Sequence, residues 1–171
     1  MKINFQHKDK NYKADLSQPL DISLPLKEGM KTVNCFYAPY MSTSPVMAGD
    51  FIGSTEKGGP LNFLNVKFNP HGNGTHTECV GHIAKEKFTI NQCLKQFWFL
   101  VEVVSVFPMK EGEDRIIKKN SFVDFCEHLG EVDAIVIRTL PNDDLKKRTN
   151  YSGSNPIYME EEATKFLVEN G

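Results

Sequence analysis

The segment from His71 to His82, HGNGTHTECVGH, constrains this chain more than any other part of its sequence. It holds three of the five histidines and one carboxylate around a glycine-rich turn. Residues 61–69 before it alternate between apolar and polar side chains, which is the pattern of a strand, and Pro70 ends that strand. The fold must therefore place this polar segment at a strand end, where a loop on a rigid scaffold can carry chemistry.

Side-chain parity predicts which members of the segment can act together. Alternate side chains share a face in an extended backbone, so His76, Glu78 and His82 point the same way if residues 76–82 are extended. His71 has the opposite parity. The turn at residues 72–74 contains two glycines, so it can adopt positive backbone angles and bring His71 back toward the others. A set of two histidines and one carboxylate then becomes feasible.

These residue types suit a divalent metal. Imidazole and carboxylate together fit zinc, iron or manganese, and a site with three protein ligands leaves positions for water and substrate, as catalytic sites do. Cys79 has odd parity and is expected to be a buried packing residue, with a thiolate ligand as the alternative. Any one histidine could instead be an ordinary hydrogen-bonded residue, as expected for His7 and His128. A phosphate-binding turn is disfavoured because no GKS or GKT follows the glycines.

The rest of the chain alternates between predicted strands and helices. Thr89 and Gln92 form a capping-box signal for a short helix, and the apolar run 97–107 predicts a buried strand. Residues 108–119 are charged and contain Gly112, which indicates an exposed turn with hairpin character. A further helix is expected to begin near Ser121 and to end at Gly130, with an apolar face at helical spacing that consists of Phe122, Phe125, Cys126 and Leu129.

The last part of the chain continues this alternation. Residues 132–139 predict an apolar strand, and residues 140–158 predict a long polar loop that either gates a substrate or is a mobile connection. The final helix begins with three glutamates, which the helix dipole favours, and its apolar face consists of Met159, Ala163, Phe166 and Leu167. The mixed order of strands and helices predicts the α/β class.

Four stretches carry a resemblance to a known family. GTHTECVGH is similar to the core of the signature HxGTHxDxPxH of the cyclase family, metal-dependent hydrolases that include kynurenine formamidase and isatin hydrolase. The stretches DISLPLKEGM (21–30) and VDAIVIRT (132–139) resemble the family's opening motif and its strand ending in Arg-Thr. The closing NPIYMEEEATKFLVENG resembles the segment whose helix precedes the later catalytic part of the family. The resemblance therefore runs over most of the chain.

The resemblance implies roles for individual residues. His76 and Glu78 correspond to metal ligands, with Glu78 where the family usually has aspartate, and His82 corresponds to the catalytic histidine. His71 is the candidate for the first ligand, although it lies one residue further back than the family's histidine, at the position before Gly72. The implied fold is a layered β/β/α arrangement with a partly closed mixed sheet.

The expected function is metal-dependent hydrolysis of an amide bond, in an aryl formamide like N-formylkynurenine or in a cyclic amide, with zinc favoured over manganese. Thr75 is expected to fix the loop through its hydroxyl. The main alternative is a module of the same fold that binds a metal or small molecule without turnover. A third reading makes Cys79 a nucleophile with His82 as its base.

Length and composition set the remaining expectations. The 171 residues suit a single domain, and the net charge of −2 gives no electrostatic case for nucleic acid or membrane partners. Four cysteines without CxxC pairing, and no signal peptide, indicate a cytoplasmic protein. Family members continue past the helix that resembles residues 159–169 and complete a second metal position there, so the chain is expected to lack that part. A homo-oligomer is expected because family members commonly associate and a shortened sheet leaves an open edge.

Overall fold

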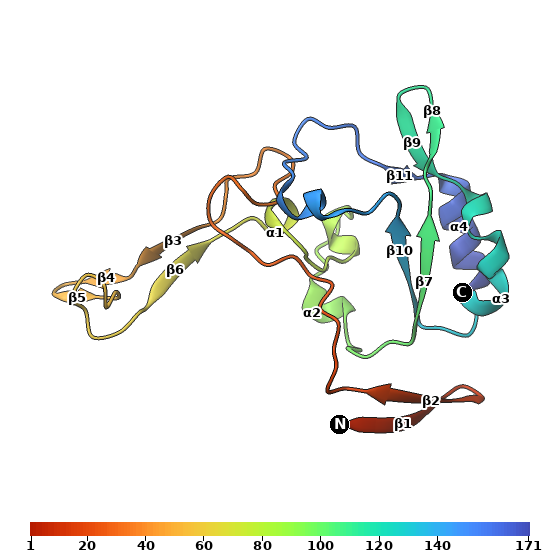
Figure 1. Cartoon of the computed structure of the whole chain (residues 1–171), viewed down its shortest axis with the longest axis horizontal. Helices are drawn as coiled ribbons and strands as arrows, with labels where there is room; N and C mark the ends of the chain where they lie inside the picture. The colour runs from red at the N-terminus through yellow and green to blue at the C-terminus, as the bar shows by residue number, and fades with distance from the viewer. The chain divides into compact units, whose positions relative to one another are not determined.

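The computed structural model describes the backbone of residues 1–171 and every side chain except that of Cys126. The chain divides into two compact units, and Figure 1 labels its strands and helices. Unit 1 comprises residues 1–22, 78–143 and 155–171, and unit 2 comprises residues 23–77 and 144–154. Strands in several small sheets are combined with a few short helices, which confirms the mixed α/β class.

The centre of unit 1 is a parallel pair of strands, β7 (Val101–Val106) and β10 (Ala134–Thr139), in which Val104 lies opposite Ile137. Both strands were predicted from their apolar runs, and β7 is shorter than the run 97–107. Asp133 fixes the entry to the pair, because its carboxylate accepts a hydrogen bond from the Leu100 amide at 2.8 Å. Val104 and Val106 of β7 are buried in the core of unit 1, and Ile135 and Ile137 of β10 pack against it.

A second, three-stranded sheet in unit 1 has the order β11 (Tyr158–Met159), β9 (Asp114–Ile117), β8 (Met109–Glu111). Strands β8 and β9 form the hairpin that the sequence indicated, and Gly112 takes a φ of 60° in its turn. Met159 was expected on the final helix but lies in β11, where it pairs with Ile117. The helix α4 (Glu161–Asn170) begins two residues later than Met159.

The core of unit 1 packs α4 and the strands around Phe122, which is fully buried. The continuous helix expected from Ser121 to Gly130 is wrong. The chain forms two 3₁₀ turns, η2 (Lys119–Ser121) and η3 (Val123–Phe125), before a single α-turn, α3 (Cys126–Leu129). Tertiary packing accounts for the difference, because the break at Phe122 lets its ring enter the core, which consists of Val104, Val106, Ile117, Phe122 and Ala163.

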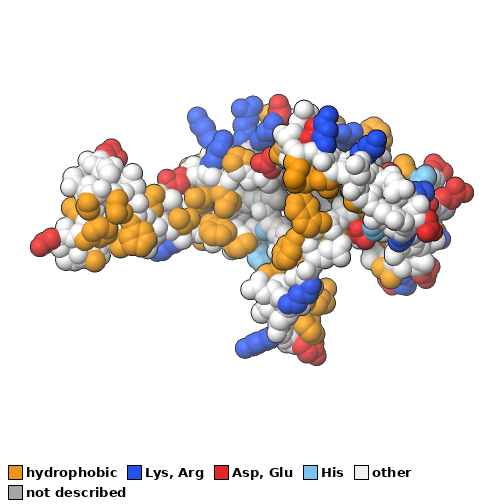
Figure 2. Space-filling view, turned by 90° about the horizontal axis from the view of Figure 1, so that it is seen from below, with side chains coloured by type: hydrophobic (Ala, Val, Ile, Leu, Met, Phe, Trp, Pro, Cys, Tyr) orange, Lys and Arg blue, Asp and Glu red, His pale blue; other side chains and the backbone are white. Residues whose placement is uncertain are grey.

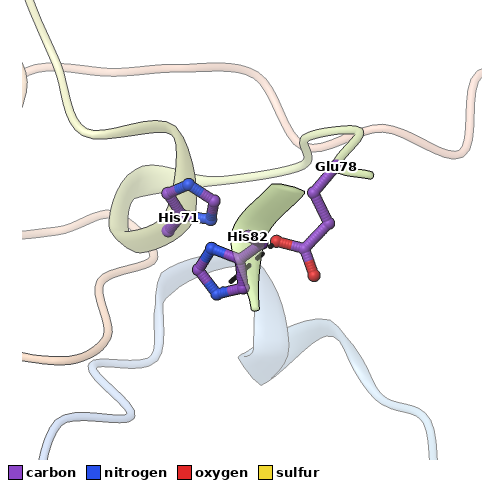
Figure 3. Close-up of side chains that lie close together, drawn as sticks. All are labelled: His71, Glu78 and His82. Carbon is purple, nitrogen blue, oxygen red and sulfur yellow. Dashed lines mark ion pairs between the residues drawn. The ribbon is translucent and has the colours of Figure 1, made fainter. Parts of the chain in front are cut away.

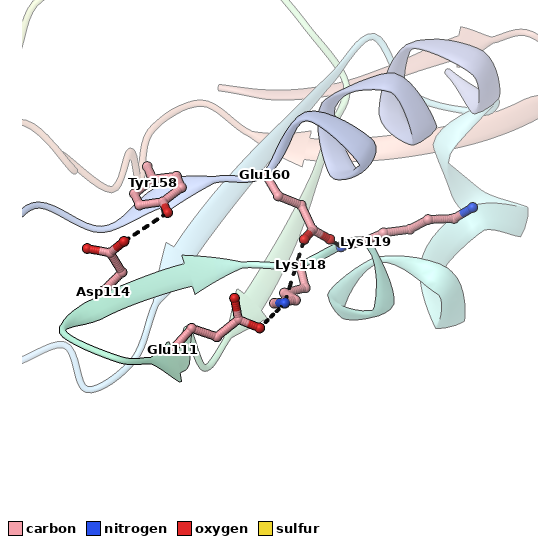
Figure 4. A network of polar contacts seen from close by, with 6 residues as sticks. All are labelled: Glu111, Asp114, Lys118, Lys119, Tyr158 and Glu160. Carbon is pink, nitrogen blue, oxygen red and sulfur yellow. Dashed lines mark hydrogen bonds and ion pairs between the residues drawn. The ribbon is translucent and has the colours of Figure 1, made fainter.

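Polar contacts join the second sheet to the start of α4 (Figure 4). The ammonium group of Lys118 forms ion pairs with Glu111 and, at 3.9 Å, with Glu160. Glu160 also accepts a hydrogen bond from the Lys119 amide at 2.7 Å, and the Tyr158 hydroxyl donates to Asp114 at 3.2 Å. These contacts fix the end of β9 against the first turn of α4.

Unit 1 also contains an N-terminal hairpin and two short helical turns. Strands β1 (Lys2–His7) and β2 (Lys10–Asp15) pair antiparallel, with the rings of Phe5 and Tyr12 stacked. The turn η1 covers Val80–His82, and α2 covers Ile90–Cys93. The predicted capping box is confirmed at α2, because the Thr89 amide donates to the Gln92 side chain at 2.9 Å.

Unit 2 contains a ribbon of two antiparallel pairs, β3 (Ser42–Pro45) with β6 (Leu64–Lys67), and β4 (Met47–Ala48) with β5 (Phe51–Ile52). The strand predicted over residues 61–69 is present as the shorter β6, but Leu64, Val66 and Phe68 are each about half exposed, so no buried apolar face distinguishes it. Figure 2 shows apolar side chains gathered on the surface of this ribbon. Unit 2 also holds α1 (Pro70–Asn73) and the 3₁₀ turn η4 (Asp144–Arg148). Among the described residues, no helix has the length and apolar character that crossing a bilayer requires.

Candidate metal and acid/base residues

The residues that present His71 form a capped helical turn, α1. Pro70 stands in the first turn, where its missing amide hydrogen costs nothing. The Asn69 side chain caps this turn by accepting from the Gly72 amide at 3.0 Å, and the Asn73 side chain accepts from the Asn69 amide at 2.7 Å. The expected glycine turn with positive backbone angles is therefore wrong, because these two asparagines close a helix instead.

The imidazole rings of His71 and His76 lie edge to face within unit 2, with their centroids 5.0 Å apart. His71 is half-buried on α1, and His76 is exposed two residues beyond Gly74. The Nδ1 atom of His76 is 3.0 Å from the Gly74 carbonyl oxygen. A carbonyl only accepts, so Nδ1 carries the proton and the lone pair is on Nε2, which is the usual tautomer of a metal-bound histidine.

Thr75 fixes the loop between the two histidines. Its hydroxyl oxygen accepts a hydrogen bond from the Leu24 amide at 2.9 Å. The contact ties residues 51 positions apart, and it matches the expected role of this hydroxyl as a loop anchor.

In unit 1, Glu78 and His82 approach each other through a turn. The expected extended backbone over residues 76–82 is wrong, because the extended run ends at Cys79 and η1 begins at Val80. The turn brings the His82 Nε2 atom to 3.9 Å from a Glu78 carboxylate oxygen, and both side chains are about half exposed. Figure 3 marks this ion pair and shows the His71 ring on the turn of α1. Helical i,i+4 spacing, rather than strand parity, therefore pairs these two residues.

The thiol of Cys79 faces the backbone of unit 1. It is half-buried, and its sulfur donates to the Phe88 carbonyl at 3.7 Å. Burial and a hydrogen bond with Cys79 raise the pKa of the neighbouring Cys93 thiol. Catalytic cysteines need surroundings that lower the thiol pKa, and the surroundings of Cys93 do the opposite.

Cys35 supports α1, a role that no sequence pattern indicated. Its amide donates to the Gly72 carbonyl at 3.0 Å, and its sulfur donates to the His71 carbonyl at 3.3 Å. Burial raises the pKa of this thiol, which keeps it protonated as a donor. The contact joins residues 36 positions apart, and no local pattern predicts such a pairing.

The chemistry of the donor set fits a divalent cation. His71 in unit 2 and Glu78 and His82 in unit 1 offer two imidazoles and one carboxylate, donor types that suit a divalent metal. His76 in unit 2 offers a third imidazole, whose Nδ1 atom contacts the Gly74 carbonyl. All four residues come from the segment that the sequence singled out.

Comparisons with known proteins agree with this chemistry at the level of a family. No curated protein and no solved structure matches the chain. A family model described as "Putative cyclase" matches residues 14–171, which include the whole segment from His71 to His82. The chain therefore belongs to the cyclase family.

Proposed function

We propose that this protein is a metal-dependent hydrolase of an amide bond, in an aryl formamide like N-formylkynurenine or in a cyclic amide. The family match over residues 14–171 carries the proposal, because it contains every histidine and carboxylate of the candidate segment. Family membership supports an enzyme that acts on a small molecule. The reaction and the substrate are the proposed part.

In this proposal His71, His76 and Glu78 hold one divalent metal, zinc in preference to manganese. The edge-to-face imidazoles of His71 and His76 and the Nε2 lone pair of His76 support the assignment. A bound metal would lower the pKa of its water toward about 7 and polarise the substrate carbonyl. Glu78 replaces the aspartate of the family signature and reaches one methylene further from its backbone.

His82 is the proposed acid/base residue. Its Nε2 atom takes a proton from the attacking water as the new carbon–oxygen bond forms, and returns that proton to the leaving nitrogen as the carbon–nitrogen bond breaks. The Glu78 carboxylate lies 3.9 Å from this atom and can orient the imidazole between these two steps. Glu78 therefore has two roles in the proposal, as a ligand and as the charge partner of His82.

The finer features expected from the resemblance belong to the same proposal. They are the layered β/β/α arrangement with a partly closed sheet, a homo-oligomer and a cytoplasmic location. Each can be measured independently of the chemistry, by an experimental structure, by the mass in solution and by cell fractionation.

The test measures hydrolysis of a formanilide and of a lactam by the purified protein, with zinc or manganese supplied and the metal content determined by elemental analysis. In His82→Ala we expect turnover to fall by about 10²–10⁴-fold while the metal content stays near that of the unmodified chain. His128→Ala is the control, since His128 is an exposed histidine outside the segment.

Three results would change the proposal. Loss of the metal in His82→Ala would make His82 a ligand and end the proposed division of roles. Metal binding by the unmodified chain without hydrolysis of either substrate would favour a non-catalytic binding module. Full activity in His82→Ala would remove this residue from the chemistry.

A further inference from the structure

Two consecutive aromatic residues in unit 2 adopt a backbone conformation that such residues rarely take. Phe36 has a φ of 57° and Tyr37 a φ of 53°. They are the central residues of a β-turn that the Ala38 amide closes by donating to the Cys35 carbonyl at 3.1 Å. Positive φ at both central positions defines the type I′ turn, which glycine, asparagine and aspartate dominate. We call residues 35–38 the aromatic turn.

Both ends of the aromatic turn are fastened to the turn of α1 that presents His71. At one end Cys35 donates to the carbonyls of His71 and Gly72. At the other end Ala38 packs so closely on Gly72 that a Cβ at Gly72 would overlap the Cβ of Ala38. The position of the aromatic turn is therefore fixed relative to His71.

The loop at residues 149–154 holds the aromatic turn from another direction. The Ser152 hydroxyl accepts a hydrogen bond from the Tyr37 amide at 2.9 Å. The Tyr37 hydroxyl lies over Gly153, where a Cβ would be 2.6 Å away. The buried side chain of Asn34 links the two segments, because it donates to the Ala38 carbonyl at 3.0 Å and accepts from the Ser152 hydroxyl at 3.4 Å. This part of the long polar loop is thus a support for Tyr37.

This arrangement buries little of either aromatic ring. The side chain of Phe36 is 79% exposed and that of Tyr37 is 80% exposed. Aromatic burial, which could offset the backbone strain, is therefore absent at both positions. Strained residues held by many surrounding contacts cluster at binding and catalytic sites.

We infer that the aromatic turn is the substrate-ring subsite of this protein, with Phe36 and Tyr37 stacking against the aromatic ring of an aryl amide. The inference rests on the proposed function and deepens it, because it names an aromatic ring as the part of the substrate that this site recognises. Aromatic pairs prefer offset or edge-to-face contact at centroid separations of about 4.5–7 Å, which two exposed rings on a rigid turn can offer. Phe36 and Tyr37 are specificity residues in this assignment, and the bond-breaking chemistry belongs to the segment from His71 to His82.

The test replaces each ring with a residue that accepts the same backbone conformation. Asparagine tolerates positive φ, so Phe36→Asn and Tyr37→Asn keep the turn and remove the rings. We expect kcat/KM for a formanilide to fall about tenfold in each variant, mainly through KM, with kcat/KM for an N-alkylformamide unchanged. Thermal denaturation should show an unchanged or higher midpoint, because the strain is relieved. Phe97→Asn is the control, since Phe97 is 74% exposed in unit 1.

The outcomes separate this inference from the proposed function. An unchanged preference for aryl over alkyl substrate in both asparagine variants overturns the aromatic subsite and leaves hydrolysis standing. If the unmodified chain hydrolyses neither a formanilide nor a lactam, the proposed function fails, and ligand-observed NMR with formanilide decides the subsite alone. Binding that weakens in Phe36→Asn and Tyr37→Asn then supports it. Absent binding, or equal binding by all variants, overturns it.

Discussion

The two units of this chain differ in the kind of side chain that each one buries. Among the described side chains, every buried apolar one lies in unit 1, and every buried polar one lies in unit 2. The apolar set is Val104, Val106, Ile116, Ile117, Phe122, Leu129 and Ala163, and the polar set is Thr32, Asn34, Ser54 and Asn73. Unit 1 is therefore stabilised by a hydrophobic core, and unit 2 by hydrogen bonds that each need a particular partner.

This difference indicates which buried side chains can be replaced and which cannot. Apolar burial is non-directional, so many side chains of similar volume can fill the core of unit 1. Buried polar groups tolerate no such exchange, because a lost partner leaves a desolvated donor or acceptor. The His71 and His76 rings belong to unit 2, where hydrogen bonds of Asn69 and Asn73 determine the position of the helical turn.

The largest effect is expected from a substitution in the hydrophobic core of unit 1. Phe122→Ala removes a fully buried ring from the core of unit 1. We expect the free energy of unfolding to fall by about 3–5 kcal/mol, from lost burial and from the cavity that remains. Denaturant titration followed by circular dichroism measures it.

Val123→Ala is the matched control, because Val123 is the next residue and its side chain is 43% exposed. Its unfolding free energy should change by no more than about 0.5 kcal/mol. Equal losses in Phe122→Ala and Val123→Ala would contradict a core centred on Phe122.

A smaller effect is expected from a substitution of a buried polar side chain in unit 2. Asn73→Ala removes the donor to the Pro39 carbonyl at 3.1 Å and the acceptor for the Asn69 amide. We expect a loss of about 1–3 kcal/mol in local stability, since the buried Asn73 side chain gives up two hydrogen bonds, each worth about 0.5–1.5 kcal/mol. Hydrogen exchange should accelerate at the Gly72 and Cys35 amides and stay unchanged at Val104 and Ile137.

Asn65→Ala is the control for this variant, because Asn65 is an exposed asparagine on β6 of the same unit. If exchange accelerates equally in both units of Asn73→Ala, the two units do not differ in what stabilises them, and the comparison fails.

The smallest effect concerns surface charge in unit 1. A hydrogen bond from Lys10 holds the pKa of the Glu131 carboxyl below its usual value. A depressed carboxyl pKa contributes stability above the usual pKa, and this stability is lost as the pH falls through the folded-state pKa. In Lys10→Met we expect the Glu131 pKa, followed by NMR, to rise toward its usual value, with a slightly weaker acid dependence of stability.

Lys13→Met is the matched control, since Lys13 is exposed on the same strand β2. A Glu131 pKa that shifts equally in both variants would reflect net charge and not the Lys10 contact.

Sequence patterns predicted the secondary-structure elements that depend on residues close together in the chain. The capping box at Thr89, the turn at Gly112 and the apolar strand β10 are confirmed, because each depends on neighbours in sequence. The helix from Ser121 failed where the burial of Phe122 overrode helical periodicity. Strand parity failed between Glu78 and His82 for a related reason, since a turn and not a strand joins them.

The sequence by itself determined the α/β class, the family and the segment that carries the candidate chemistry, because these depend on residue types and short spacings. Only the tertiary structure decided what supports that segment. The bonds of Cys35 to α1, the strained turn at Phe36 and Tyr37, and the loop at residues 149–154 beneath it join residues far apart in the chain. Such contacts depend on how the chain closes on itself, so no local pattern encodes them. The segment from His71 to His82 thus contains the candidate residues, while distant residues determine how part of it is presented.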